Sequence, residues 1–156
     1  MTTRALSGTG LDDVSKAIIE ALQHDGRRSY ASIGESVGLS EAAVRQRVQR
    51  LLESGVMQIV AVTDPVQVGF ARQAMIGVRV GGDPVAVAAE FEKLTEVDYV
   101  VITAGSFDLL VEVVCEDDAH LLELIAKKIR PCEGVVSTET FVYLKLHRQR
   151  YDWGTR

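Results

Sequence analysis

The chain has few of the residues on which disulfide and metal chemistry depend. Among its 156 residues there are only two cysteines and three prolines. Cys115 falls in an apolar run and Cys132 follows a proline, without the CxxC or Cys/His spacing of a zinc site. We therefore expect two reduced thiols with structural roles, and neither a metal nor a cofactor.

Long hydrophobic segments are missing as well. No apolar run reaches the roughly 18 residues that a membrane span requires, and the N-terminal stretch lacks the apolar core of a signal peptide. Hydrophobic residues nevertheless make up 47% of the chain, which is enough to build a core. These features predict a globular cytoplasmic protein with no membrane partner.

Signatures of catalysis are absent too. The sequence shows no paired carboxylates, nucleophile elbow or phosphate-binding loop. His24, His120 and His147 are scattered and fit solvated side chains. The acidic run at 116–118 stands directly before a predicted helix, where carboxylates favour the helix N-terminus. We expect no catalytic residues, no metal site and no enzymatic activity.

Charge is distributed unevenly. The formal net charge of −5 argues against simple coating of nucleic acid. Residues 1–64 are close to neutral and hold a local cluster of arginines, whereas residues 65–156 are clearly acidic. This asymmetry fits a DNA-binding domain joined to an acidic partner domain. We place the boundary between Asp64 and Phe70.

Three helices are predicted in the first part. Apolar residues recur at helical spacing over 11–25, 29–37 and 41–54, and Gly55 suits the end of the last helix. The stretch Val56–Thr63, rich in valine and isoleucine, predicts a strand that forms a wing or a linker.

The junction between the second and third helices has the chemistry of a helix-turn-helix. Gly34 is small enough for close helix packing, Gly38 permits a sharp turn, and Ser40 is a good N-cap. The side chains expected to pack against the first helix are Ile33, Val37, Leu39, Val44 and Val48.

The opposite face of the third helix carries the candidate DNA-binding residues. Those expected to project outward are Ser40, Glu41, Ala42, Arg45, Gln46 and Gln49. Arginine pairs with guanine and glutamine with adenine in the major groove. Arg47 and Arg50 suit phosphates or pairs within the domain, and Ser29 and Ser32 suit phosphate oxygens. A solvated amphipathic helix is the alternative, but the three helices together favour binding to double-stranded DNA.

The second part predicts strands and helices in the order βαββαβ, so the fold class is α+β. This is a ferredoxin-like arrangement with both helices on one face of an antiparallel sheet. Its strands are predicted over 73–80, 99–103, 109–115 and 135–144, and its helices over 84–94 and 118–129. The strands are apolar at nearly every position, which indicates that a second copy covers the other face.

The chain resembles the leucine-responsive/asparagine-regulator (Lrp/AsnC) family of transcription factors. The likeness rests on LDDVSKAIIEAL with HDGRRSYASIGESVGLS, on VRQRVQRLLESGVM, and on the later blocks GSFDLLVEV and GVVSTET. It implies a winged helix-turn-helix, a linker strand and a βαββαβ (RAM) domain. It also implies homodimers that assemble further, for example into octamers.

The resemblance further implies an effector site near a G-x-x-D turn. The matching residues are Gly105, Ser106, Phe107 and Asp108, joined by Thr138 and Thr140 on the last strand. A glycine turn can offer N–H groups to a carboxylate, and an aspartate can accept from an ammonium group. Ala104 departs from the threonine usual in the family. The alternative is an ordinary strand connection capped by Asp108.

These observations predict a sequence-specific transcriptional regulator that responds to an amino acid or a related metabolite. Two alternatives stay open: a nucleoid-organising protein without an effector, and a regulatory subunit of amino-acid metabolism. The C-terminal tail from His147 to Trp153 either packs on a neighbouring subunit or is loose.

Overall fold

The computed structural model describes residues 10–156, which form two compact units. The first unit runs to Ala61 and takes in Arg148–Arg156, and the second spans Val62–His147. The division thus lies slightly before the boundary predicted after Asp64. The first nine residues of the predicted DNA-binding domain lie outside the described residues.

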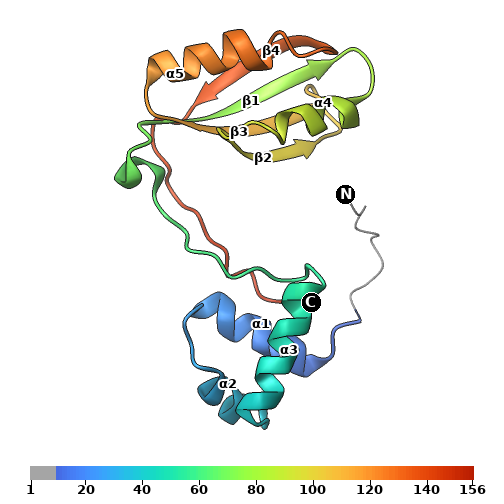
Figure 1. Ribbon diagram of the computed structural model, residues 1–156, viewed down its shortest axis with the longest axis vertical. Helices are drawn as coiled ribbons and strands as arrows, with labels where there is room; N and C mark the ends of the chain where they lie inside the picture. Colours follow the sequence, from blue (N-terminus) through green and yellow to red (C-terminus); the bar gives the residue numbers. More distant parts are fainter. Residues whose placement is uncertain (1–9) are drawn as a thin grey trace. The chain divides into compact units, whose positions relative to one another are not determined.

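Three helices build the first unit (Figure 1). They are α1 (Asp13–His24), α2 (Tyr30–Val37) and α3 (Glu41–Glu53). Each begins after a side chain that accepts a hydrogen bond from a backbone N–H of the first turn, which would otherwise lack a partner. These N-caps are Asp12, Ser29 and the predicted Ser40. The three predicted helices are confirmed apart from their end residues.

The turn between α2 and α3 follows the glycine chemistry expected from the sequence. Gly38 has a φ of 72°, in the left-handed region that favours glycine. Leu39 then donates its N–H to the carbonyl of Gly34 at 2.9 Å, so the chain folds back tightly against α2. Gly34 itself is buried. The hydrophobic core of this unit comprises Ile18, Ile19, Leu22, Ile33, Val44, Val48 and Leu51.

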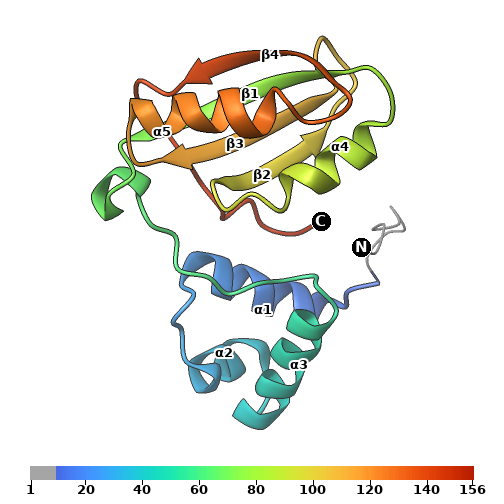
Figure 2. The same cartoon turned by 45° about the horizontal axis from the view of Figure 1, so that its top comes forward.

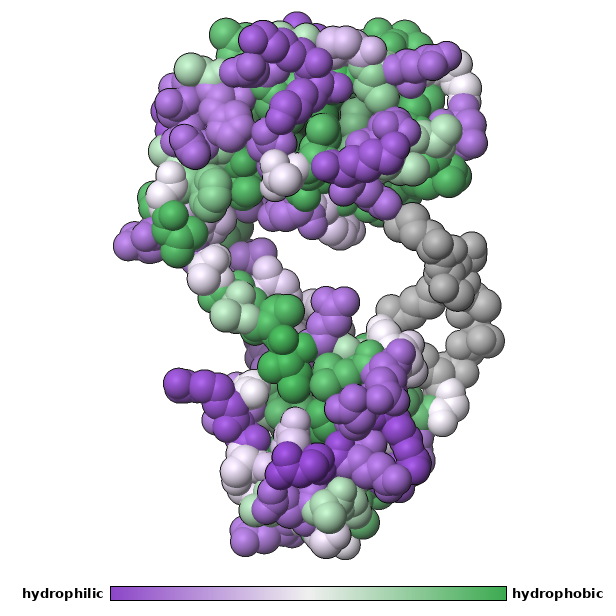
Figure 3. All heavy atoms as spheres, in the orientation of Figure 1, coloured by the Kyte–Doolittle hydropathy of each residue, from purple (hydrophilic) through white to green (hydrophobic). Residues whose placement is uncertain are grey.

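The strand predicted over Val56–Thr63 is not formed. Val56 and Met57 donate their N–H groups to the carbonyl of Leu51 at the end of α3, and no described strand pairs with residues 56–63 to build a ladder. Ile59, Val60 and Val62 are consequently exposed, and hydrophobic residues lie at the surface along this part of the chain (Figure 3). A 3₁₀ turn, Pro65–Val68, follows.

The second unit has the predicted βαββαβ order. Its elements are β1 (Arg72–Val80), α4 (Pro84–Phe91), β2 (Val97–Ile102), β3 (Leu109–Cys115), α5 (Asp118–Glu123) with a π-helical turn (Leu124–Ile129), and β4 (Val135–Val142). The antiparallel sheet has the strand order β2-β3-β1-β4. Both helices cover the same face (Figure 2). The predicted helix over 118–129 is therefore α-helical only in its first half.

The two faces of the sheet differ in burial. On the helix face, alternate side chains are fully buried: Ala74, Ile76 and Val78 of β1, and Leu109, Val111, Val113 and Cys115 of β3. No helix of the described chain covers the opposite face, which we call the open face. It carries half-buried Met75 and Leu110, while Tyr99 and Phe141 are 51% and 45% exposed. The open face also carries Gln73, Arg79, Glu112 and Glu139, so it is mixed, and the sequence expectation of strands apolar on both faces holds only in part.

A buried carboxylate links the second helix to the start of β2. Glu96 is 8% exposed and accepts hydrogen bonds from Lys128 at 2.5 Å and from His120 Nε2 at 3.2 Å. The N–H of Glu116 donates to His120 Nδ1, so the neutral ring carries its proton on Nε2. The hydrogen bond from Lys128 lowers the pKa of Glu96 to about 2. This network satisfies a charge that burial would otherwise destabilise.

The C-terminal tail packs on the first unit of its own chain. Gly154 donates its N–H to Gln23 Oε1 at 3.0 Å, and the hydroxyl of Thr155 donates to Glu20 at 2.6 Å. The C-terminus accordingly lies beside the three helices (Figure 1). These hydrogen bonds come from Gly154 and Thr155, just beyond the His147–Trp153 segment considered from the sequence, whose residues are exposed. The tail also leaves the predicted 65–156 domain, because its hydrogen bonds are made with α1.

Candidate DNA-binding and effector sites

Helix α3 has one face in the core and one in solvent. Val44, Val48 and Leu51 are buried against α1 and α2, which fixes the rotation of the helix. The exposed face carries the predicted residues Glu41, Ala42, Arg45, Gln46, Gln49 and Arg50. The structure therefore brings six of the predicted DNA-binding residues together on one solvent-facing surface.

Arg45 is held in place by two neighbours. Its guanidinium donates to Glu41 at 2.6 Å and lies 5.3 Å from the ring centroid of Tyr30. A cation over an aromatic face is attracted by the ring quadrupole. Sequence reasoning missed Tyr30, the first residue of α2, because only the packing of α2 against α3 brings it to Arg45.

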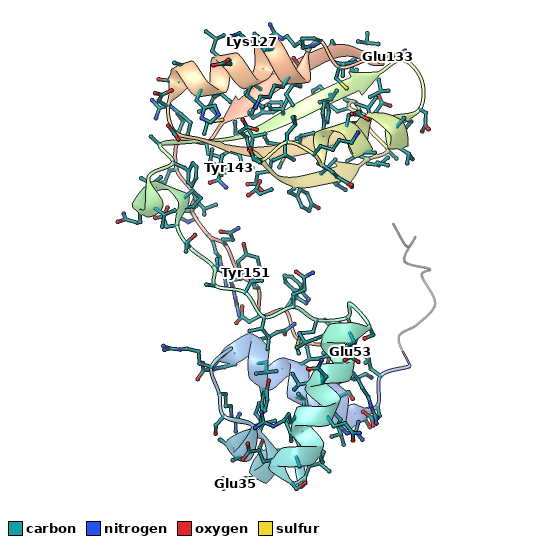
Figure 4. The ribbon with its side chains drawn as sticks, in the orientation of Figure 1. Glu35, Glu53, Lys127, Glu133, Tyr143 and Tyr151 are labelled. Carbon is teal, nitrogen blue, oxygen red and sulfur yellow. The ribbon has the colours of Figure 1, made fainter. Side chains whose placement is uncertain are left out.

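The other exposed polar residues of α3 differ in their partners. Gln49 donates to Glu53 at 2.8 Å, and Glu53 lies at the C-terminal end of α3 (Figure 4). Gln46 and Arg50 make no hydrogen bond or ion pair with any residue that the structure describes. Their polar groups are free for a ligand.

Arg47 makes a pair within the domain, one of the two roles considered from the sequence. Its guanidinium contacts Asp12 at 2.7 and 2.9 Å and Ser15 at 3.1 Å. Hydrogen bonds from Ser15, followed by that from Arg47, lower the pKa of Asp12 to about 2. Arg47 thereby joins α3 to the N-terminus of α1 through its Nη1 group.

The three predicted serines have local roles that leave a proton free. Ser29 and Ser40 accept cap hydrogen bonds, so their own hydroxyl protons can still be donated to a phosphate oxygen. Ser32 accepts from Arg28 Nε at 3.3 Å. Sequence reasoning also missed Arg28, for which the signal was the Arg27-Arg28 pair preceding the cap.

The predicted effector turn connects β2 to β3. Thr103 closes the turn, since its N–H donates to the carbonyl of Asp108 at 2.9 Å and its hydroxyl donates to the carbonyl of Phe107 at 2.5 Å. Gly105 and Ser106 are exposed at the tip. The carboxylate of Asp108 accepts the N–H of Val80 at 2.8 Å. The Asp108 side chain therefore joins the turn to β1, and neither the predicted ligand role nor a cap within the turn accounts for this contact.

Phe107 lies on the open face of the sheet. Its ring contacts that of Phe141 edge to face, with centroids 6.2 Å apart, and Arg79 stands 5.7 Å above its centroid. Thr138 and Thr140 point to the other face, because they pair with the buried Val78 and Ile76. Within one protomer the sheet therefore separates the two threonines from Phe107, and the predicted effector residues do not form one pocket.

No group of three or more His, Cys, Asp or Glu side chains within residues 10–156 could hold a metal ion. None of the described helices is long and apolar enough to cross a membrane.

Comparisons with known proteins match both units. Residues 11–52 match the AsnC-type helix-turn-helix domain, and residues 73–153 match the Lrp/AsnC ligand binding domain. An uncharacterised HTH-type transcriptional regulator of Pyrococcus furiosus is 34% identical over 143 residues, covering 90% of this chain and 97% of the relative.

Solved structures agree. Escherichia coli AsnC superposes with a TM-score of 0.77 at 26% identity, covering 90% of this chain and 97% of that one. A transcriptional regulator of Neisseria meningitidis in complex with L-Met gives 0.78 at 25% identity, covering 91% and 95%. These relatives are named as regulators, not as enzymes. The chain belongs to the Lrp/AsnC family of DNA-binding transcriptional regulators, and its second unit is the ligand-binding domain of that family.

Proposed function

We propose that the protein is a sequence-specific regulator that reads a major groove with α3. The observation that carries this proposal is that α3 buries one side and exposes the other. Its apolar side packs in the core, and Arg45, Gln46 and Gln49 face solvent. Arginine and glutamine match the hydrogen-bonding edges of guanine and adenine. On binding, Arg45 would exchange Glu41 for a base.

Phosphate contacts would flank this reading face. Arg50 is unpaired among the described residues, and the hydroxyls of Ser29, Ser32 and Ser40 can each donate a hydrogen bond. Such contacts set the register of a protein on the duplex without reading sequence. Arg47 is not included, because its guanidinium already pairs with Asp12.

A second copy would cover the open face. Tyr99 and Phe141 expose large rings there, beside half-buried Met75 and Leu110. Packing two such faces buries apolar surface and is self-complementary around a two-fold axis. The resulting homodimer would present two copies of α3 to a palindromic site. Assembly of dimers into an octamer, implied by the family, belongs to the same proposal.

The regulator would respond to an amino acid or a related metabolite bound near residues 105–108. Support comes from the exposed turn and from the Neisseria relative, whose structure contains L-Met. Differential binding of an effector to two assembly states changes DNA affinity by coupling, typically by about 1–3 kcal/mol. The protein would act on DNA in the cytoplasm.

DNA binding to a selected site and to a random duplex, each over a series of salt concentrations, tests the proposal. A regulator should prefer the selected site by about 10³-fold or more, with affinity for both falling as salt rises. Equal affinities would favour a nucleoid-organising protein. No binding at low salt would favour a regulatory subunit without DNA. A thermal-shift screen of the twenty amino acids tests the effector, because a ligand of the native state raises the melting temperature.

A further inference from the structure

Two neighbours hold the guanidinium of Arg45 near the first turn of α3. Glu41, the first residue of α3, accepts a hydrogen bond from it at 2.6 Å. The ring centroid of Tyr30, on α2, lies 5.3 Å from Arg45 Cζ, and this partly buried ring packs against the core of the first unit. The tyrosine therefore gives the arginine a fixed support, and the arginine in turn orients Glu41.

Glu41 and Arg45 remain open to solvent in spite of these contacts. Their side chains are 53% and 64% exposed, so both can reach a ligand without a change in the helix. They are four residues apart, a spacing that places two side chains on the same side of a helix. Within residues 10–156, Arg45 is the only residue whose side chain donates a hydrogen bond to the Glu41 carboxylate.

Reading of DNA by Arg45 takes that donor away from Glu41. When Arg45 turns to a base, the carboxylate is left beside the phosphates of the duplex, which carry charge of the same sign. A carboxylate that leaves water for an interface needs a hydrogen-bond donor. The first residues of a recognition helix face the base edges of the major groove, so a base must supply the donor.

Cytosine suits a carboxylate best among the four bases. Guanine presents two acceptors in the major groove, and thymine presents an acceptor and a methyl group, so neither can donate. Adenine offers its N6 amino group, but the acceptor N7 lies beside it and repels a carboxylate. Cytosine offers its N4 amino group without such an acceptor. Arg45 has donors only and therefore suits guanine.

We propose that Glu41 is a specificity-determining residue that accepts a hydrogen bond from N4 of a cytosine close to the guanine read by Arg45. Four residues span about 6 Å along a helix, which corresponds to about two base pairs at a rise of about 3.4 Å. The half-site should therefore hold a cytosine and a guanine within about two base pairs of each other. Tyr30 has a positioning role, because it supports Arg45 without facing a base. This inference rests on the proposed function, since it names bases that α3 would read.

Sites selected from a randomised duplex library by the full chain provide the probe. At the cytosine of the recovered half-site, duplexes carrying each of the four base pairs are titrated and followed by fluorescence anisotropy. Wild type should prefer cytosine at least about fivefold, the lower end of the range for a base contact. Glu41→Gln should prefer adenine there instead, because glutamine pairs with N6 and N7 of adenine. Its preference for guanine at the neighbouring position should remain.

The matched control is Glu53→Gln, which removes the same charge at the opposite end of α3. Glu53 is exposed, accepts from Gln49 at 2.8 Å, and lies about 18 Å further along the helix. Glu53→Gln should keep the preference for cytosine. Tyr30→Leu should lower discrimination at the cytosine and at the guanine, whereas Tyr30→Phe, which keeps the ring, should restore it. Equal discrimination by wild type and Tyr30→Leu would remove the positioning role of the tyrosine.

The remaining outcomes separate this inference from the proposed function. If Glu41→Gln binds all four duplexes more tightly by one common factor and still prefers cytosine, the carboxylate only repels phosphates. The assignment of Glu41 is then wrong, while reading by α3 stands. Recovered sites without a cytosine within about two base pairs of the guanine would overturn the assignment as well. If wild type recovers no preferred site, sequence reading by α3 fails, and this inference fails with it.

Discussion

The carbonyl oxygen of Leu39 lies 2.5 Å from the position that a Cβ of Gly34 would occupy. Gly34 is in the middle of α2, and Leu39 is the residue after the turn glycine. The absence of one methyl group therefore sets how closely the chain can return from α2 toward α3. The rotation of α3 depends on this packing. The contact between Gly34 and Leu39 therefore also determines which residues of α3 face solvent.

Gly34→Ala should destabilise the helical unit. Alanine is a better helix former by about 1 kcal/mol, so a tolerant site would become more stable. Overpacking against a backbone oxygen costs about 1–3 kcal/mol, and we expect this cost to win. Urea unfolding followed by circular dichroism measures the free energy. Gly26→Ala is the matched control, because the nearest atom to its Cβ is 3.8 Å away. A more stable Gly34→Ala would contradict the packing argument.

Asp12 should make stability depend on acid. Its hydrogen bonds with Ser15 and Arg47 lower the pKa from 3.8 to about 2 in the folded chain. A carboxyl group whose pKa is lowered by folding stabilises the fold at pH values above its ordinary pKa. That contribution is lost as the pH falls toward the pKa of the folded state. The difference in stability between wild type and Asp12→Asn should therefore shrink between about pH 4 and pH 2.

Thermal unfolding across pH 2 to 7 in roughly half-unit steps measures this difference. Asp13→Asn serves as the control, because the carboxylate of Asp13 is fully exposed and lies 3.9 Å from the ammonium group of Lys16. A constant gap between wild type and Asp12→Asn over the whole range would show that the ion pair does not contribute.

Two arginines on α3 should behave differently toward DNA. Arg45→Ala should cost about 1–3 kcal/mol on the selected site and much less on random DNA, because a base contact is lost. Arg50→Ala should weaken binding to both sites by similar factors and reduce the salt slope by about one. Fluorescence anisotropy at several salt concentrations measures both quantities. Equal losses on the two duplexes for Arg45→Ala would rule out direct reading by that residue.

Asp108 offers a test of the turn itself. Asp108→Ala leaves the partly buried N–H of Val80 without its acceptor, which should cost about 1 kcal/mol, the lower end of the penalty for a buried donor. Asp108→Asn keeps an oxygen at the same place and should be close to wild type in stability. Chemical unfolding of the two variants measures the difference. Equal stability of both would mean that water replaces the carboxylate at no cost.

Local signals in the sequence predicted most of the fold. The N-cap Ser40, the turn at Gly38 and the apolar strand at 109–115 are short-range features, and all three are confirmed. The strand over Val56–Thr63 failed for the complementary reason. Its residue types favour extended backbone, but a strand also needs a partner that lies elsewhere.

The candidate sites divide in the same way. The exposed residues of α3 follow from helical periodicity, so Arg45, Gln46 and Gln49 could be named in advance. Their partners could not: Arg47 and Asp12 are 35 residues apart, and only packing of α3 on α1 brings them together. Likewise, no sequence pattern predicts that Thr138 and Phe107 lie on opposite faces of the sheet. The face on which a side chain lies depends on the register between strands.

Sequence alone thus determined which segments become helices and strands, and which residue types each exposes, because backbone propensity and apolar period act over a few neighbours. Tertiary structure decided which charges are already paired, where the tail docks, and which glycine carries an aromatic ring. Those outcomes depend on contacts between residues far apart in the chain, such as Thr155 with Glu20 and Phe107 with Gly77.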